Sequence, residues 1–108
     1  MPQSSLDGCS YNCIYITPAL DWDERKRIAN LRKHGIDFVD ARHIFQRSTI
    51  EVRDARRDYG EDRIGAFGEI GDEVLVVVYV WREGRRRLIS ARRAGTDERR
   101  AYFEAIAS

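Results

Sequence analysis

The sequence predicts an α+β domain, in which an antiparallel twisted sheet of four to five strands carries two N-terminal helices and a C-terminal helix. Three stretches, residues 23–35, 36–45 and 96–107, have the apolar spacing of short amphipathic helices. Between them, residues 48–94 have the short alternating or continuously apolar runs of strands, and turn residues separate these runs. The helices are expected to cover one face of the sheet, which leaves the other face for function.

The chain is expected to begin its folded part with a short strand within residues 13–22, which Pro18 interrupts because it cannot donate a ladder hydrogen bond. The first helix follows in "DERKRIANLRKHG", with Asp23 as its N-cap and Gly35 as its stop. Ile28 and Leu31 would form its buried stripe. A separate polar stripe recurs at i, i+4 and i+7 and consists of Lys26, Asn30 and Lys33.

The second helix is expected in "IDFVDARHIF", where Asp37 caps it and Phe38, Ala41 and Phe45 share one face. The strands are expected in "STIEVRDA", "RIGAFGEI", "EVLVVVYVW" and "RRRLISARRA", joined by turns at "DYGED", "GD" and "REG". The third strand is apolar on both faces and should therefore be central. Thr96 should cap the last helix, whose buried side would be Tyr102, Ala105 and Ile106.

The length of 108 residues fits one domain, with residues 1–16 as an N-terminal extension and residues 17–108 as the domain. No apolar run approaches the roughly 18 residues of a membrane span, and the first residues lack the basic and apolar regions of a signal peptide. We therefore expect a cytoplasmic protein with Cys9 and Cys13 reduced. No second pair of cysteines or histidines follows nearby, so neither a metal nor a cofactor is expected.

The net charge of +1 hides a strongly basic segment. Residues 82–93 hold six arginines and a single acid, Glu83, which points to a specific anionic partner. Among the 19 basic residues of the chain, only Lys26 and Lys33 are lysines. An arginine can bind a phosphate through two hydrogen bonds, whereas a lysine acts as a point charge.

Regular alternation along the last strand would place arginines on both of its faces. Those near the hairpin, Arg82, Arg85 and Arg86, read as solvated residues that protect a sheet edge. Arg87 and Arg92 lie inside or at the end of an apolar run, so each should be paired or face a groove.

Three motifs in order identify a resemblance. "WDERKRIANLRKHGIDFVDARHIF" resembles the opening motif of the BrnT toxin family, "RRDYGEDR" its middle and "RLISARRAGTDERRAY" its closing motif. The resemblance covers about residues 21–103 and leaves residues 1–16 unexplained. It implies the toxin of a type II toxin–antitoxin system with a RelE-like ribonuclease fold, which cuts RNA, inhibits translation and arrests growth.

The same resemblance implies the partners. The antitoxin would be BrnA-like, with a ribbon-helix-helix part that binds operator DNA and a segment that covers the toxin. The toxin itself would contact RNA, on the ribosome or free, and would meet operator DNA only through the antitoxin. No membrane partner is expected, because the sequence has no apolar run of the length of a membrane span.

Metal-free RNA cleavage is a transesterification that needs proton transfer and cations around the phosphorane. His34 is the candidate for proton transfer, although a histidine in the last turn of a helix also suits the helix dipole. Lys33 and Arg92 are expected to contact the phosphorane, with Lys26 and Arg87 next. The substrate-binding candidates are Ser90, Arg63, Tyr102 and Arg93; for Tyr102 the alternative is core packing, as it is for Trp22.

Two other functions remain open at this point. A toxin of the same fold could act on DNA gyrase instead of RNA. Alternatively, the arginine patch could belong to a non-catalytic module that binds phosphate or an acidic protein segment, with salt-dependent RNA binding but no cleavage.

Overall fold

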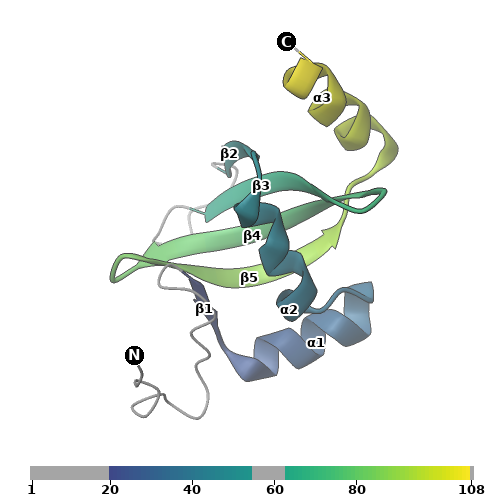
Figure 1. Cartoon of the computed structure of the whole chain (residues 1–108). Coiled ribbons are helices and arrows are strands. Elements are labelled where there is room, and N and C mark those ends of the chain that lie inside the picture. The colour runs from purple at the N-terminus through teal and green to yellow at the C-terminus, as the bar shows by residue number, and fades with distance from the viewer. Residues whose placement is uncertain (1–19, 55–62, 108) are drawn as a thin grey trace.

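The computed structural model describes residues 20–54 and 63–107 and confirms the α+β class (Figure 1). The predicted turn at "DYGED" and the N-terminal extension lie outside these residues. The elements follow one another as β1 (Leu20–Trp22), α1 (Glu24–His34), α2 (Phe38–Ala41), the 3-10 helix η2 (Arg42–Gln46), β2 (Ile50–Asp54), β3 (Arg63–Ile70), β4 (Glu73–Arg82), β5 (Arg85–Arg93) and α3 (Thr96–Ala107).

The sheet has five strands in the order β1-β5-β4-β3-β2, and β4 is central as predicted. The prediction of an antiparallel sheet is wrong at one edge, because β1 pairs with β5 in parallel through Leu20–Arg86, Asp21–Arg87 and Trp22–Leu88. Strands β2 to β5 form antiparallel pairs of neighbours, which short connections favour. The strand β1 is separated from β5 by the rest of the fold, so no local turn sets its direction.

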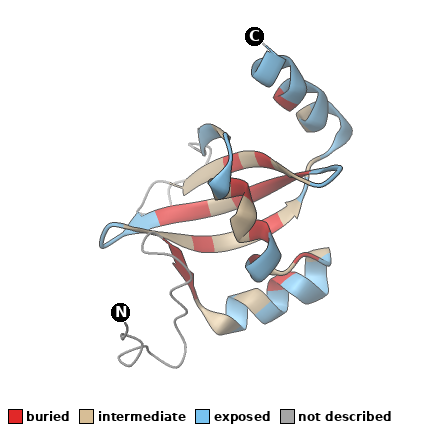
Figure 2. Ribbon diagram, in the orientation of Figure 1, coloured by how far each residue is buried: buried red, intermediate tan, exposed pale blue. Residues whose placement is uncertain are grey.

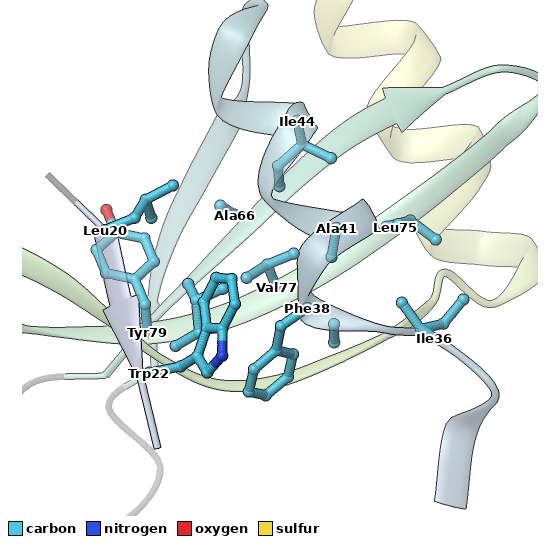
Figure 3. Close-up of a cluster of buried hydrophobic side chains, with 12 residues drawn as sticks. Leu20, Trp22, Ile36, Phe38, Ala41, Ile44, Ala66, Leu75, Val77 and Tyr79 are labelled. Carbon is cyan, nitrogen blue, oxygen red and sulfur yellow. The ribbon is translucent and has the colours of Figure 1, made fainter. Parts of the chain in front are cut away.

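The core lies between the sheet and the helices α2 and η2 (Figure 3). Its largest side chains are Trp22, Tyr79 and Phe38, and each is almost completely buried. The ring of Trp22 meets that of Phe38 edge to face, at 5.8 Å between centroids. Gly68 lets η2 approach β3, because a Cβ atom there would lie 2.6 Å from Cβ of Ile44.

Two helix caps occur where the sequence predicts them. The Asp23 carboxylate accepts a hydrogen bond from the Arg25 N–H at 2.8 Å, and Asp37 accepts one from the Val39 N–H at 2.9 Å. Gly35 ends α1 with a φ of 74°, in the left-handed region that glycine tolerates. The second helix is shorter than predicted, since it changes to a 3-10 helix after Ala41.

The predicted buried stripe of α1 is wrong. Ile28 and Leu31 are 44% and 40% exposed, and the buried residue of this helix is Asn30. The helix therefore meets the sheet through Asn30, the middle residue of the polar stripe, and not through the apolar stripe. Hydrogen bonds to the backbone of β5 and of the α1–α2 connection, described below, are the physical reason.

The last helix is mostly exposed. Figures 1 and 2 show α3 projecting beyond the sheet, with most of its surface exposed. Tyr102 is buried as predicted, but Ala105 and Ile106 are exposed. The predicted cap at Thr96 is also wrong: the helix starts at Thr96, the Gly95 carbonyl accepts from the Arg99 N–H, and the Glu98 carboxylate accepts from the Gly95 N–H.

Candidate functional site

A register shift in β5 decides which of its side chains share a face. Val78 pairs with Ser90 but Tyr79 pairs with Leu88, so Ile89 is an extra residue opposite this step of β4. As a result Leu88 and Ala91, three residues apart, both join the buried cluster. The regular alternation that the sequence predicts along β5 is therefore wrong after Leu88.

The arginines before the register shift are held by β1, β2 and the core. The Arg86 guanidinium lies over the rings of Phe45, Trp81 and Tyr79, with its carbon 4.7, 4.8 and 5.2 Å from their centroids. It also lies 3.8 Å from the Glu51 carboxylate. Arg86 is thus part of the packing and not the solvated edge residue that the sequence predicts.

Arg87 faces its register partner on β1. Its guanidinium lies 3.5 Å from the Asp21 carboxylate, whose side chain is only 10% exposed. Burying that carboxylate beside a cation is far less costly than burying it alone. Of the two alternatives that the sequence predicts for Arg87, a charged partner or a groove, the structure shows the charged partner.

The arginines after the register shift bind acidic residues of other elements. Arg92 donates two hydrogen bonds to the Glu98 carboxylate, at 2.8 and 2.9 Å, and so ties β5 to α3. These bonds, with the one from the Gly95 N–H, lower the pKa of Glu98 to about 2, and the pKa of Arg92 is raised in turn. Arg93 pairs with Glu73 at 2.8 Å and donates to the His34 carbonyl at 3.3 Å, at the end of α1.

A groove of about 220 Å³ runs between α1 and β5. It brings together four of the residues that the sequence selects, namely Lys26, Lys33, His34 and Ser90, and Asn30, Ala29 and Ile89 complete its lining. The two lysines lie on one side of α1 because seven residues are close to two helical turns. Lys33 and His34 both line the groove although they are adjacent in the sequence.

The groove is cationic and its charges are available. None of its lining residues is an acid. Within residues 20–54 and 63–107, the side chains of Lys26, Lys33 and His34 have no hydrogen-bond or ion-pair partner. An anion that entered the groove would therefore not have to displace a carboxylate of the described chain.

Arg63 and Tyr102 lie away from this groove. Arg63 begins β3, which β4 separates from β5 in the sheet. Tyr102 is 4% exposed on α3, and burial raises its pKa, as does the nearby Glu69 carboxylate. Trp22 is completely buried, which confirms its place in the core. In the described parts of the chain, no three His, Cys, Asp or Glu side chains gather in a way that would hold a metal ion.

Comparison with known families decides the class of protein. The family model for BrnT, the ribonuclease toxin of type II toxin–antitoxin systems, matches residues 22–98, which is well over half of the chain. The chain belongs to the BrnT family. The four candidates that the structure places in the groove, Lys26, Lys33, His34 and Ser90, lie inside the match, and so do the arginines of β5. No curated protein matches the chain.

Membership carries two consequences. A BrnT toxin is a ribonuclease toxin, and a type II toxin has a protein antitoxin as its partner. No helix in the described part of this toxin is long and apolar enough to cross a membrane.

Proposed function

We propose that this BrnT toxin is a metal-independent endoribonuclease whose reaction centre is the groove between α1 and β5. The observation that supports this is the set of basic side chains Lys26, Lys33 and His34, which have no partner among the described residues and lie in a groove that no acid lines. RNA offers a chain of phosphates, and cations that are not already neutralised bind it at the lowest cost. Four arginines of β5 are bound to carboxylates or rings and are less available, namely Arg86, Arg87, Arg92 and Arg93.

Each groove residue has a role that its chemistry suits. Lys26 and Lys33 lie seven residues apart, about 10 Å along the helix axis, which allows contacts to successive phosphates. His34 is the proton-transfer group, because histidine changes its charge near neutral pH. Ser90 is placed to donate a hydrogen bond to a phosphate oxygen.

The proposed reaction is an internal transesterification. The ribose 2′-oxygen loses its proton and attacks the adjacent phosphorus, and the bond from phosphorus to the 5′-oxygen of the next nucleotide breaks. The products are a 2′,3′-cyclic phosphate and a 5′-hydroxyl that has gained a proton. Lys33 stabilises the charge on the phosphorane oxygens, and His34 carries out one of the proton transfers, which typically contributes 10²–10⁴ in rate.

The proposal extends to the biology of the toxin. Cutting RNA would inhibit translation and arrest growth in the cytoplasm until a BrnA-like antitoxin binds, and operator DNA would be contacted only through that antitoxin. We also propose that the α+β fold is of the RelE-like type. Family membership and the order of the elements support both statements.

The test uses purified toxin, free of antitoxin, with naked RNA in chelator in one tube and translating ribosomes, in the Mg²⁺ buffer that they need, in another. We expect cyclic-phosphate ends in at least one tube, and the tube identifies whether the ribosome is needed. If both tubes remain uncut while the same protein arrests growth in cells, the proposal is wrong. Salt-dependent RNA binding in those tubes would then indicate a phosphate-binding module, and DNA damage in the arrested cells would indicate a gyrase target.

A further inference from the structure

Asn30 is the one buried residue of α1, with 6% of its surface exposed, and it lies on the helix between the two lysines. Its side-chain amide makes three hydrogen bonds. The Nδ2 atom donates to the carbonyl oxygens of Ile36 at 2.9 Å and Ala91 at 2.8 Å, and Oδ1 accepts from the Ala91 N–H at 3.0 Å. Every one of these partners is a backbone group far along the chain or beyond the end of the helix.

The bonds to Ala91 take the place of a strand. The strand β1 pairs with β5 only as far as Trp22 and Leu88, so among residues 20–54 and 63–107 no strand neighbours β5 on that side at Ala91. Ala91 is buried, and unpaired N–H and C=O groups there would be costly. The Asn30 amide presents one acceptor and one donor to them, as a backbone unit of a longer β1 would.

The third bond, to the Ile36 carbonyl, fixes the C-terminal end of α1. By holding the Ile36 carbonyl, Asn30 also ties down the turn after Gly35, where the helix ends. The helix is therefore attached to the sheet at a point one residue from Ser90 in β5 and three residues from Lys33 in α1. Ser90 lines the groove together with Asn30.

We propose that Asn30 is a positioning residue, which completes the edge of the sheet in place of β1 and thereby holds Lys33 and His34 opposite Ser90. This inference rests on the proposed function, because it assigns Asn30 a part in RNA cleavage through the groove residues. A buried amide is suited to this task because its three directional hydrogen bonds fix both the rotation of α1 about its axis and its position along β5. Apolar contacts are not directional and allow a helix to shift along the sheet.

The test compares Asn30→Ala with Ile44→Ala, a core change in η2 at a residue that does not line the groove. Single-turnover cleavage and the RNA Kd are measured for each variant, per folded molecule. We expect Asn30→Ala to lower the cleavage rate about 100-fold, because a misplacement of about 1 Å can have that effect, and to change the Kd less than about threefold. Ile44→Ala should keep the rate within about threefold.

Equal rate losses in the two variants, or a loss confined to the Kd, would overturn the inference. Should Asn30→Ala not fold, hydrogen exchange of the wild-type protein decides: the Ala91 amide must be protected, and free exchange there contradicts the assignment. A wild-type protein that cuts no RNA defeats the proposed function alone. In that case inorganic phosphate is titrated while the His34 ring is followed by NMR, and a response identical in wild type, Asn30→Ala and Ile44→Ala defeats the positioning role.

Discussion

Two cationic regions of this toxin differ in what surrounds their charges. On β5, the guanidinium groups of Arg86, Arg87, Arg92 and Arg93 each have a carboxylate at 2.8 to 3.8 Å, and Arg86 also lies against three rings. Along the groove, the side chains of Lys26, Lys33 and His34 have no such partner in the described residues. The density of basic residues in a sequence therefore does not locate the charges that are free to bind a substrate.

The difference follows from what each side chain can do. An arginine has five donors in a plane and suits paired, stacked positions that hold elements together. The β5 arginines connect this strand to β1, β2, β4 and α3. A lysine at the surface of a helix keeps its charge in water, and it becomes useful when a groove brings several such charges to one anion.

The largest expected effect is on catalysis in the groove. Lys33→Ala combined with His34→Ala should lower the single-turnover cleavage rate by about 10²–10⁴, because a proton transfer and a phosphorane contact are both removed. The free energy of unfolding should change by less than about 1 kcal/mol, since Lys33 is exposed and His34 is only partly buried. The matched control is Arg32→Ala, which removes a charge from the same turn of α1 outside the groove.

The next largest effect is expected for a β5 arginine, and it should change the free energy of unfolding without changing cleavage. Replacement of Arg86 by alanine removes the cation from Phe45, Tyr79 and Trp81, and should lower the free energy of unfolding by about 2 kcal/mol in urea titrations. Arg86→Lys keeps the charge without the flat guanidinium and should recover only part of this loss. Cleavage per folded molecule should not change, and a specific loss of cleavage would break the comparison.

A smaller effect concerns the loss of stability at low pH. The pKa of Glu98 is lowered from 4.5 to about 2 by Arg92 and the Gly95 N–H, so the folded protein holds this carboxylate charged more strongly than the unfolded chain does. The stability it gives is complete above about pH 4.5 and is lost as the pH falls toward 2. Because 36% of the Glu98 side chain is exposed, we expect only about 1 kcal/mol. The urea midpoint of the wild-type protein should therefore be lower at pH 3 than at pH 5. In Glu98→Gln the drop should be smaller by the contribution of this carboxylate.

The smallest effect concerns salt. Lys26→Ala should weaken RNA binding less than about tenfold and reduce the slope of log K against log salt by about 0.7, the value for one phosphate contact on a single strand. Arg25→Ala, an exposed neighbour outside the groove, is the control. An equal change of slope in both variants would mean that charge at this end of α1, and not the groove, attracts RNA.

Much of the fold was predictable because local signals are strong in this sequence. The caps Asp23 and Asp37, the stop at Gly35 and the central strand β4 all occur as predicted. The parallel pairing of β1 and the register shift at Ile89 were not predictable, because both depend on partners distant in the chain. The apolar residues of α1 and α3 that are exposed were also mispredicted, because apolar spacing alone does not show which side of a helix meets the rest of the fold. In α1 that contact is made by Asn30.

For the site, the sequence selects the two lysines, His34 and Ser90, and the structure places all four around one groove. It also selects Arg92 and Arg93, whose acidic partners Glu98 and Glu73 are not recognisable as partners from spacing alone. The i, i+4, i+7 stripe did contain the missed residue, Asn30. Its polarity in the middle of the stripe was the available signal, because a buried polar residue needs bonding partners.

The most direct test of the account compares Lys33→Ala with Arg92→Ala for metal-free cleavage of one RNA, as single-turnover rates per folded molecule in chelator. Each change removes one cation, Lys33→Ala from the opening motif and Arg92→Ala from the closing motif. Only Lys33 lines the groove, whereas Arg92 is bound to Glu98. The account predicts a loss of about 100-fold or more for Lys33→Ala and less than about threefold for Arg92→Ala. An active Lys33→Ala beside an inactive, folded Arg92→Ala would contradict it.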